Sequence, residues 1–278
     1  MSYKIILDSC GELTEKMKRD EHFETASLSI QIDEYNIVDD ETFDQADFLV
    51  KVAASPNCPK SSCPSPQSYM EGYACEEEHV YVVTLSAELS GSYNSAEVGK
   101  NLYHEEYGAK DIHIFNSCSA SIGETLIAMK IQECEELGMS FQEVVDRVEG
   151  YIEGQHTYFI LESLETLRKN GRLTGLKAFV ASALNIKPIM GEKKGVIIQL
   201  GQARGMNKAL AKMIEYIEKE AVDAKQKTLG ISHCNCKERA ELVKSMLEDQ
   251  LQVKDIIIND TAGISSMYAN DGGIIIAL

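Results

Sequence analysis

The sequence lacks any apolar run long enough to form a membrane-spanning helix. Its apolar stretches are short, such as Ile274–Leu278, whereas a transmembrane helix needs roughly 20 residues. The first apolar stretch, Ile5–Leu7, is followed at once by Asp8, and this pattern argues against a secretory signal peptide. We therefore expect a cytoplasmic protein with reduced thiols and without a transmembrane segment.

Basic residues are scarce relative to acidic ones. The chain has 27 Lys and Arg against 44 Asp and Glu, so its formal net charge at pH 7 is −17. Such a surface repels phosphate backbones and anionic lipid headgroups, and nucleic acid is not an expected partner. A small anionic ligand stays possible, because backbone amides, hydroxyls and a single Arg can bind it locally.

The motifs of several catalytic and nucleotide-binding sites are absent. The sequence contains neither the G-x-S-x-G motif of a nucleophile elbow nor the G-x-x-x-x-G-K-[ST] and G-x-G-x-x-G motifs of nucleotide-binding loops. None of the six His residues lies in a recognisable acid–base motif. We therefore expect no catalytic residues, no cofactor and no self-sufficient enzyme.

The eight cysteines do not predict a metal site. Cys234 and Cys236 follow His233, but these three side chains supply at most three ligands where a structural zinc site needs four. The other cysteines are scattered, and several lie in apolar patterns where a free Cys behaves as a small hydrophobic residue. We expect no bound metal, and the role of Cys234 and Cys236 stays open.

The apolar pattern of the first half indicates an α/β fold. Short β-branched runs alternate with helical patterns, which is typical of a mostly parallel sheet with flanking helices. The expected strands are Lys4–Leu7, Leu28–Ile32, Asn36–Val38, Val80–Leu85 and Ile112–Phe115. The expected helices are Phe43–Ala54 with Thr42 as a possible N-cap, Pro66 to about Cys75, Ser95–Tyr103, Ile122–Leu137 and Phe141–Ile152.

The pattern changes after about Gln155 and predicts a mixed α/β sheet. The expected strands are Thr157–Ile160, Asn185–Met190, Val196–Leu200, Thr228–Ser232, Asp255–Ile258 and Gly273–Leu278. The expected helices lie near Ser163–Asn170 and Leu173–Ala183 and at Asn207–Ala224 and Lys237–Leu251. We therefore expect two α/β domains, residues 1–155 and 156–278, with the ligand in the cleft between them.

Small hydroxyl residues follow the first-half strands, at the edge where an open parallel sheet binds its ligands. Ser90, Gly91 and Ser92 form the best candidate site. Gly91 permits close approach of the backbone, and a serine hydroxyl can donate to an anion at the start of a helix. These residues alone favour the simpler interpretation that the serines only cap the helix.

Two further segments carry candidate ligand-binding residues. Ser61 and Ser62 lie in Lys60–Pro66, where prolines restrict the direction of the hydroxyls, although the segment is also a plain helix entry. Arg172 follows an Asn-Gly turn, and Arg204 follows a hairpin-like stretch. Each arginine either pairs with a carboxylate or phosphate or is a solvated surface residue.

Five motifs occur along the chain in a specific order. They are Ile5–Ser9, Lys60–Pro66 (KSSCPSP), Leu85–Ala96 (LSAELSGSYNSA), Leu164–Gly175 (LETLRKNGRLTG), and Asn185–Met190 (NIKPIM) followed by Gly195 and Arg204. Their order and spacing resemble those of the DegV family of bacterial fatty-acid-binding proteins. The resemblance extends from end to end of the chain.

The resemblance implies a two-domain α/β protein that encloses one long-chain fatty acid of the palmitate, stearate or oleate class. The carboxylate is then expected at the mouth of the cleft between the domains. There Ser61 takes the place of a Thr or Ser that hydrogen-bonds the carboxylate. Ser90 and Gly91 would supply a hydroxyl and an amide from the other side, with Ser62 and Ser92 as neighbouring candidates.

The resemblance also implies a protein partner. Members of the family hand the bound acyl group to a separate fatty acid kinase, which uses ATP to make an acyl phosphate. By this analogy Arg172 lies near the mouth, close to the head group or to the docked kinase, and Arg204 is a second candidate for docking. The chain would then be a carrier without its own catalytic centre.

The chain departs from the family pattern in two places. Ser61-Ser62-Cys63-Pro64 stands where the family usually has Thr-Ser-Gln-Pro, a change that keeps the hydroxyl. Tyr268–Gly272 stands where family members commonly carry His-x-Gly-Pro-Gly. A phenol can still donate a hydrogen bond, but it is neutral at pH 7 and cannot supply the charge or proton transfer of a His. We therefore keep Tyr268 as a lipid-binding candidate, and the departure concerns kinase coupling more than lipid binding.

Two other functions stay open on the sequence. One is an enzyme that acts on a small anionic substrate and uses the same hydroxyl-rich junctions as an anion hole. The other is a lipid-sensing regulatory protein without kinase coupling, which Tyr268 favours. Several apolar residues could line a tail pocket or could equally be ordinary core: Ile160, Leu161, Phe179, Leu184 and Ile189.

Overall fold

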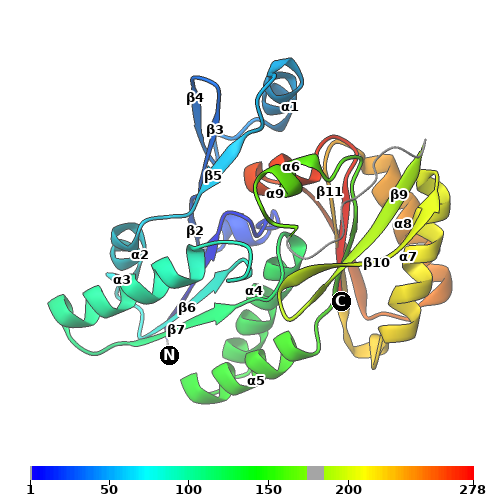
Figure 1. Ribbon diagram of the computed structural model, residues 1–278. Coiled ribbons are helices and arrows are strands. Elements are labelled where there is room, and N and C mark those ends of the chain that lie inside the picture. The colour runs from blue at the N-terminus through cyan, green and yellow to red at the C-terminus, as the bar shows by residue number, and fades with distance from the viewer. Residues whose placement is uncertain (1, 174–184) are drawn as a thin grey trace.

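The computed structural model describes residues 2–173 and 185–278, and its first half contains a four-stranded parallel sheet (Figure 1). The strand order is β2-β1-β6-β7. The strands are β1 (Tyr3–Asp8), β2 (Phe23–Ala26), β6 (His79–Thr84) and β7 (Asp111–Asn116). Their isoleucine and valine residues are buried on both faces, as expected for a parallel sheet covered by helices.

Helices cover both faces of this sheet. Ile5 and Leu7 of β1 pack against one helical layer, and Ile6 between them packs against the other, because successive side chains of a strand point to opposite faces. The first layer consists of α4 (Ile122–Glu136) and α5 (Phe141–Glu153). The second consists of α2 (Pro66–Tyr73) and α3 (Ser92–Tyr107).

The second half forms a six-stranded mixed sheet with the order β10-β9-β8-β13-β11-β12. Its strands are β8 (Thr157–Ile160), β9 (Ile186–Lys193), β10 (Val196–Arg204), β11 (Thr228–His233), β12 (Asp255–Asp260) and β13 (Ile274–Ala277). Within this sheet β11 and β12 are parallel, and the other neighbouring pairs are antiparallel. The helices α7 (Met206–Glu220) and α8 (Lys237–Gln250) cover one face.

Helix α4 lies between the two sheets. Ile127 and Ile131 face the parallel sheet, while Ile122 and Leu126 pack with Ala277 of the mixed sheet. A helix that is apolar on two sides shows little amphipathic contrast, and nearly the whole first half of α4 is buried. The two halves are therefore joined through a helix that belongs to both cores.

A small three-stranded sheet projects from the first half at the top of Figure 1. It consists of β3 (Ser29–Ile32), β4 (Tyr35–Val38) and β5 (Lys60–Ser62), accompanied by α1 (Gln45–Ala54). This projection contacts the second half at α9 (Gly263–Ala269). Two carboxylate oxygens of Asp39 accept hydrogen bonds from Gly263 N at 2.6 Å and Ile264 N at 2.8 Å.

The α/β class and the sequence of main elements agree with the expectations. The helix expected from Phe43 begins at Gln45 instead, because Asp44 rather than Thr42 caps it by accepting from Asp47 N at 2.9 Å. The helix expected at Asn207–Ala224 ends at Glu220 and is followed by the separate 3-10 turn Ala224–Gln226. The helix expected at Leu173–Ala183 lies, except for Leu173, outside the described residues.

Besides the 3-10 turn Ala224–Gln226, four short elements in the described part of the chain were not expected from the sequence. They are β2, α9, the 3-10 turn Met17–Arg19 and the strand β5 within the hydroxyl-rich segment. The helix α9 is buried on nearly every side, so its sequence has no amphipathic period. Within residues 2–173 and 185–278, no helix has both the length and the apolar character that crossing a membrane requires.

Candidate functional site

A cavity lies between the inner face of the mixed sheet and the loops of the parallel sheet. One wall follows from strand alternation: Thr157, Phe159 and Leu161 are spaced two apart along β8 and its end, so they share one face. Ile275 is paired with Phe159 in the neighbouring strand and lies on the same wall. Ile197 of β10 extends this wall.

The opposite wall is formed where strands of the parallel sheet end. Leu85 and Leu89 follow β6, and the segment 118–121 follows β7. Ile264 and Tyr268 of α9 complete the wall. The cavity therefore lies outside the carboxyl ends of parallel strands, the position at which open α/β sheets bind their ligands.

The cavity is narrow. The empty space between its walls, including the part open to solvent, is about 730 Å³, and little of it is wider than a water molecule. Such a shape suits a thin, unbranched molecule rather than a compact one. Apolar side chains dominate the lining, which favours an apolar ligand.

Three of the residues expected from the sequence meet at one end of the cavity. Tyr268 Oη and Ser61 Oγ are 3.1 Å apart, within hydrogen-bond distance. The guanidinium carbon of Arg172 lies 5.9 Å from the centre of the Tyr268 ring, in the range of a cation–π contact. These three residues, from three distant parts of the chain, define what we call the mouth of the cavity.

Backbone carbonyls position the Arg172 side chain. Its Nε donates to Leu89 O at 3.1 Å and its Nη1 donates to Asn170 O at 2.6 Å. Asn170 in turn donates through Nδ2 to Pro59 O at 3.0 Å, which ties this turn to the segment before Ser61. Both acceptors of Arg172 are neutral, so they leave its positive charge uncompensated and able to attract an anion.

Ser90 and Gly91 lie beside the segment that carries Ser61. A Cβ atom on Gly91 would be 3.3 Å from Cys63 Sγ, so the two loops pass each other closely and glycine leaves room for this contact. Ser90 Oγ accepts from Ser92 N at 3.2 Å. The hydroxyl proton of Ser90 is not used in that bond and can be donated to another acceptor.

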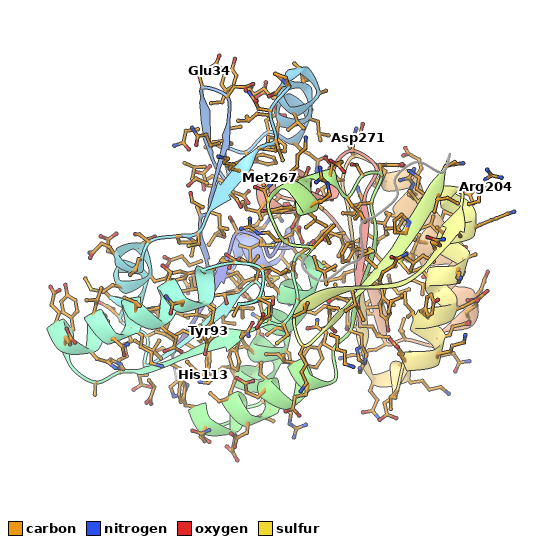
Figure 2. The ribbon with its side chains drawn as sticks, in the orientation of Figure 1. Glu34, Tyr93, His113, Arg204, Met267 and Asp271 are labelled. Atoms are coloured by element: carbon orange, nitrogen blue, oxygen red, sulfur yellow. The ribbon has the colours of Figure 1, made fainter. Side chains whose placement is uncertain are left out.

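The remaining expected residues do not join the mouth. Ser62 is on the other face of β5, and its Oγ lies 3.2 Å from Ser29 Oγ. Ser92 is fully buried and donates to Asp8 Oδ2 at 2.6 Å. Arg204 is exposed at the end of β10, and Figure 2 shows it at the edge of the molecule, well away from Met267 of α9.

The titratable groups along the cavity are mostly kept neutral. Burial raises the pKa of the Tyr268 phenol, so this group is protonated and can donate a hydrogen bond at neutral pH. Burial also raises the pKa of the Cys10 and Cys118 thiols in the lining, which keeps both thiols protonated. Within the described residues, no group of three or more His, Cys, Asp and Glu side chains is arranged to hold a metal ion.

Comparison with known proteins identifies the family. The model of the family described as "Uncharacterised protein, DegV family" matches residues 2–277. The chain belongs to the DegV family. A DegV domain-containing protein of Streptococcus pyogenes serotype M18 is 33% identical over 282 residues, which cover 99% of this chain and 98% of that protein.

Solved structures of DegV proteins are similar to this chain over its whole length. A DegV family protein from Ruminococcus gnavus, described with vaccenic acid, has 59% identity and a TM-score of 0.98, with 100% of both chains covered. The Fatty Acid Kinase (Fak) B3 protein of Streptococcus pneumoniae, loaded with linoleic acid, has 30% identity and a TM-score of 0.89, with 100% of this chain and 99% of that chain covered. A DegV protein from Eubacterium eligens, loaded with heptadecanoic acid, has 25% identity and a TM-score of 0.90, with 99% of each chain covered.

The structure also corrects the expected tail-pocket residues of this DegV chain. Leu161 lines the cavity, but Ile160 and Ile189 face the opposite side of the mixed sheet and pack in the core beneath α7. Phe179 and Leu184 lie outside the described residues. Cys234 is fully buried beside the cavity wall, where burial raises its pKa and it packs with apolar neighbours.

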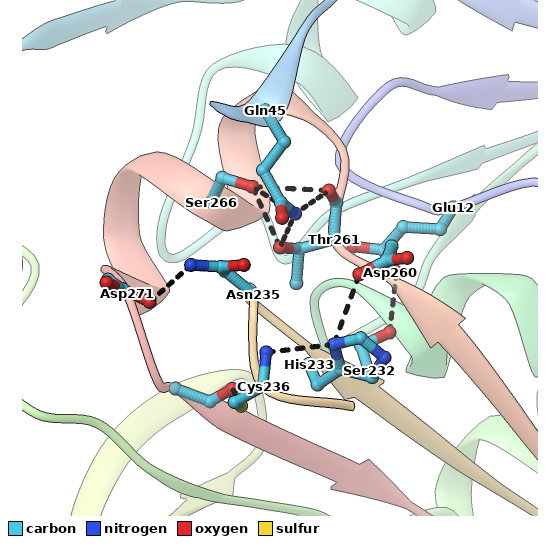
Figure 3. A network of polar contacts seen from close by, with 11 residues as sticks. Glu12, Gln45, Ser232, His233, Asn235, Cys236, Asp260, Thr261, Ser266 and Asp271 are labelled. Carbon is cyan, nitrogen blue, oxygen red and sulfur yellow. Dashed lines mark hydrogen bonds and ion pairs between the residues drawn. The ribbon is translucent and has the colours of Figure 1, made fainter. Parts of the chain in front are cut away.

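Sequence reasoning missed a group of buried carboxyls between the two halves. Asp8 and Glu124 are fully buried, and burial raises the pKa of both. Glu12 accepts from Ser121 Oγ at 2.8 Å in the first half and from Ser232 Oγ at 3.0 Å in the second, as Figure 3 shows for Ser232. Only Asp8 had a sequence signal, its position at the end of a strand, because isolated acidic residues are normally on the surface.

Proposed function

We propose that this DegV chain binds one long-chain fatty acid, with the acyl tail in the cavity and the carboxylate at the mouth. The observation that supports this most strongly is the joining of a narrow apolar cavity to the Ser61, Tyr268 and Arg172 side chains at one end. Such a site is amphipathic in the same way as a fatty acid. The fatty acids described with the similar DegV structures support the same ligand class.

The tail supplies most of the expected affinity. At about 0.8 kcal/mol per buried CH₂, a tail of roughly 15 methylenes gains on the order of 12 kcal/mol before the costs of association. A hydrogen bond to the charged carboxylate contributes about 1.5–3 kcal/mol. Loss of translational and rotational freedom takes back an estimated 4 kcal/mol or more. The contacts at the mouth therefore fix the orientation of the acid rather than supply the bulk of the affinity.

At the mouth, Ser61 and Tyr268 would donate hydroxyl hydrogen bonds and Arg172 would supply the positive charge. Ser90 and Gly91 would contribute a hydroxyl and a backbone amide from the opposing loop. Ser62 and Ser92 are weaker candidates, because their hydroxyls contact Ser29 and Asp8 instead.

We further propose that the chain is a carrier subunit without its own catalytic centre and that it presents the carboxylate to a separate fatty acid kinase. The similarity to the Fak B3 protein supports this partner. Arg172 would lie on the surface that docks the kinase. Arg204, which is farther from the mouth, would contact the kinase at the edge of that surface. We also propose the domain division at residue 155, in the connection between α5 and β8.

A pair of matched variants tests the binding site. Ser61→Ala removes a hydroxyl at the mouth, whereas Ser62→Ala removes a neighbouring hydroxyl that faces Ser29. Titration of lipid-free protein with palmitate should show a Kd about tenfold higher for Ser61→Ala, since about 1.4 kcal/mol corresponds to a factor of ten. Ser62→Ala should bind like the parent. Equal affinities for all three proteins would contradict the placement of the carboxylate.

Kinase coupling needs its own experiment. Palmitate-loaded chain, a bacterial fatty acid kinase catalytic subunit and ATP should yield an acyl phosphate, detected as its hydroxamate. A protein that binds palmitate tightly but gives no acyl phosphate with any such kinase would be a lipid sensor rather than a carrier.

A further inference from the structure

One loop forms a side of the mouth. The mouth loop, residues 85–92, runs from the end of β6 to the start of α3. Leu85 and Leu89 of this loop line the cavity, and Leu89 O accepts the hydrogen bond from Arg172 Nε at 3.1 Å. Ser90 follows directly in the chain. The positions of the Arg172 guanidinium and of the Ser90 hydroxyl therefore depend on how this loop is held.

A single carboxylate joins both ends of the mouth loop. Asp8 ends β1, and β1 pairs with β6 in parallel, so the Asp8 side chain lies beside the point where β6 ends. Its Oδ2 accepts from Leu85 N at 2.9 Å and from Ser92 Oγ at 2.6 Å, which belong to the first and the last residue of the loop. Its Oδ1 accepts from Cys10 N at 3.1 Å. The carboxylate thus fastens the two ends of the loop to each other and to β1.

The other hydrogen bonds of the mouth loop hold its first half. Ser86 O accepts from Ser90 N at 3.1 Å, and Ser86 N donates to Ser119 O at 2.8 Å, which anchors the start of the loop. Ser92 N donates to Ser90 Oγ at 3.2 Å, a bond that ties the loop only to itself. The bond from Ser92 Oγ to Asp8 therefore attaches the second half of the loop to β1.

The Asp8 carboxyl costs folding free energy. It is fully buried, and burial raises its pKa, although hydrogen bonds from Ser92 and Leu85 act in the opposite direction. Burial and the charge of Asp8 together raise the pKa of Glu124, a second fully buried carboxyl. An uncharged side chain in place of Asp8 would avoid this cost. A group that lowers stability and also organises a binding loop is typical of a functional site.

We propose that Asp8 is a positioning residue of the fatty-acid site, which fixes the mouth loop so that Arg172 and Ser90 meet the carboxylate of the acid. This inference rests on the proposed fatty-acid binding and adds a residue that does not itself touch the ligand. Release of the loop should weaken recognition of the carboxylate more than binding of the tail, because most of the cavity wall comes from other segments.

Two ligands with the same tail separate these effects. Palmitate and 1-hexadecanol differ in the carboxylate, so the ratio of the Kd for hexadecanol to the Kd for palmitate measures recognition of the head group. Competition against radiolabelled palmitate on the lipid-free full chain gives both values. The ratio should fall about tenfold in Asp8→Asn, because an amide has one acceptor oxygen and cannot hold Cys10 N together with both ends of the loop.

A second variant and a matched control complete the test. Ser92→Ala removes one end of the same connection and should lower the ratio by less, and the double variant should fall no further than Asp8→Asn alone. Glu135→Gln makes the same change from carboxyl to amide at the other end of the parallel sheet, where Glu135 Oε1 accepts from Tyr81 Oη at 2.6 Å. This control should keep the ratio of the parent.

The outcomes separate this inference from the proposed function. A merely structural role of Asp8 would raise both Kd values by the same factor, and an unchanged ratio in Asp8→Asn would refute the positioning role while fatty-acid binding stands. If Asp8→Asn does not fold, an unchanged ratio in Ser92→Ala refutes it instead. An equal fall in Glu135→Gln would overturn it as well, because the effect would not be local. If neither ligand binds the parent protein, the proposed function fails and the positioning role fails with it.

Discussion

Replacement of Glu12 by Gln should remove a pH dependence of stability that is built into the contact between the two halves. Glu12 is 4% exposed, and its carboxylate accepts hydrogen bonds from Ser121 and Ser232. Burial outweighs these bonds and raises the pKa of Glu12 from 4.5 to about 7. The carboxyl group is thus easier to ionise in the unfolded chain than in the folded protein.

The sign of the effect follows from proton binding. Between pH 4.5 and 7 the folded protein holds the Glu12 proton while the unfolded chain has released it, so stability falls as the pH rises through this range and levels off above it. The difference between the two pKa values corresponds to about 3 kcal/mol in total at 1.36 kcal/mol per pH unit. About 2 to 3 kcal/mol of this loss should fall between pH 5 and 8.

Urea unfolding at pH 5, 6, 7 and 8 measures this loss. The stability of Glu12→Gln relative to the parent should rise by about 2 to 3 kcal/mol from pH 5 to pH 8, because Gln cannot ionise. Glu15→Gln is a matched control, since the Lys18 ammonium holds the pKa of that exposed carboxyl below its usual value and it stays ionised throughout this range. Parallel stability curves for the parent and Glu12→Gln would refute the reasoning.

Three further predictions concern the mouth, the tail and the contact between the halves. Arg172→Gln should raise the Kd for palmitate roughly 10- to 100-fold. Arg168 is exposed and paired with Glu165, so Arg168→Gln should leave the Kd unchanged in the same titration. Ala120 lines the cavity, so Ala120→Trp should fill it and abolish palmitate uptake while the protein keeps its cooperative thermal unfolding. Undiminished uptake would show that the acyl tail does not bind in this cavity. A Cβ at Gly230 would lie 2.3 Å from Ile122 Cγ1, so Gly230→Ala should lower the free energy of unfolding by about 1–3 kcal/mol. Gly150→Ala on α5 meets open space and should raise it by about 0.5–1 kcal/mol; urea unfolding of both variants checks the contrast.

The sequence predicted those elements whose local pattern carries the signal. Val80–Val83 is a continuous β-branched and aromatic run that is buried on both faces, which a parallel central strand requires. The helix α9 has no such signal, because it is buried on nearly every side and shows no helical period. In the sequence, Tyr268 is marked only by its departure from a family motif, and no local pattern places it on a helix that lines the cavity.

Which residues meet at the mouth depends on contacts between distant segments, and the local sequence pattern does not encode these contacts. Ser61 and Ser62 look equivalent in sequence, and only the pairing of β5 with β3 decides that Ser61 faces Tyr268 while Ser62 faces Ser29. Non-local register of this kind is set by the whole sheet rather than by either segment.

The most direct test of the central claim is denaturing mass spectrometry of an organic extract from protein purified without added lipid. We expect a long-chain fatty acid in near-stoichiometric amount. An extract without fatty acid, together with failure of the protein to take up oleate or palmitate, would contradict the account. The narrow cavity and its mouth would then have to serve a different, small anionic ligand.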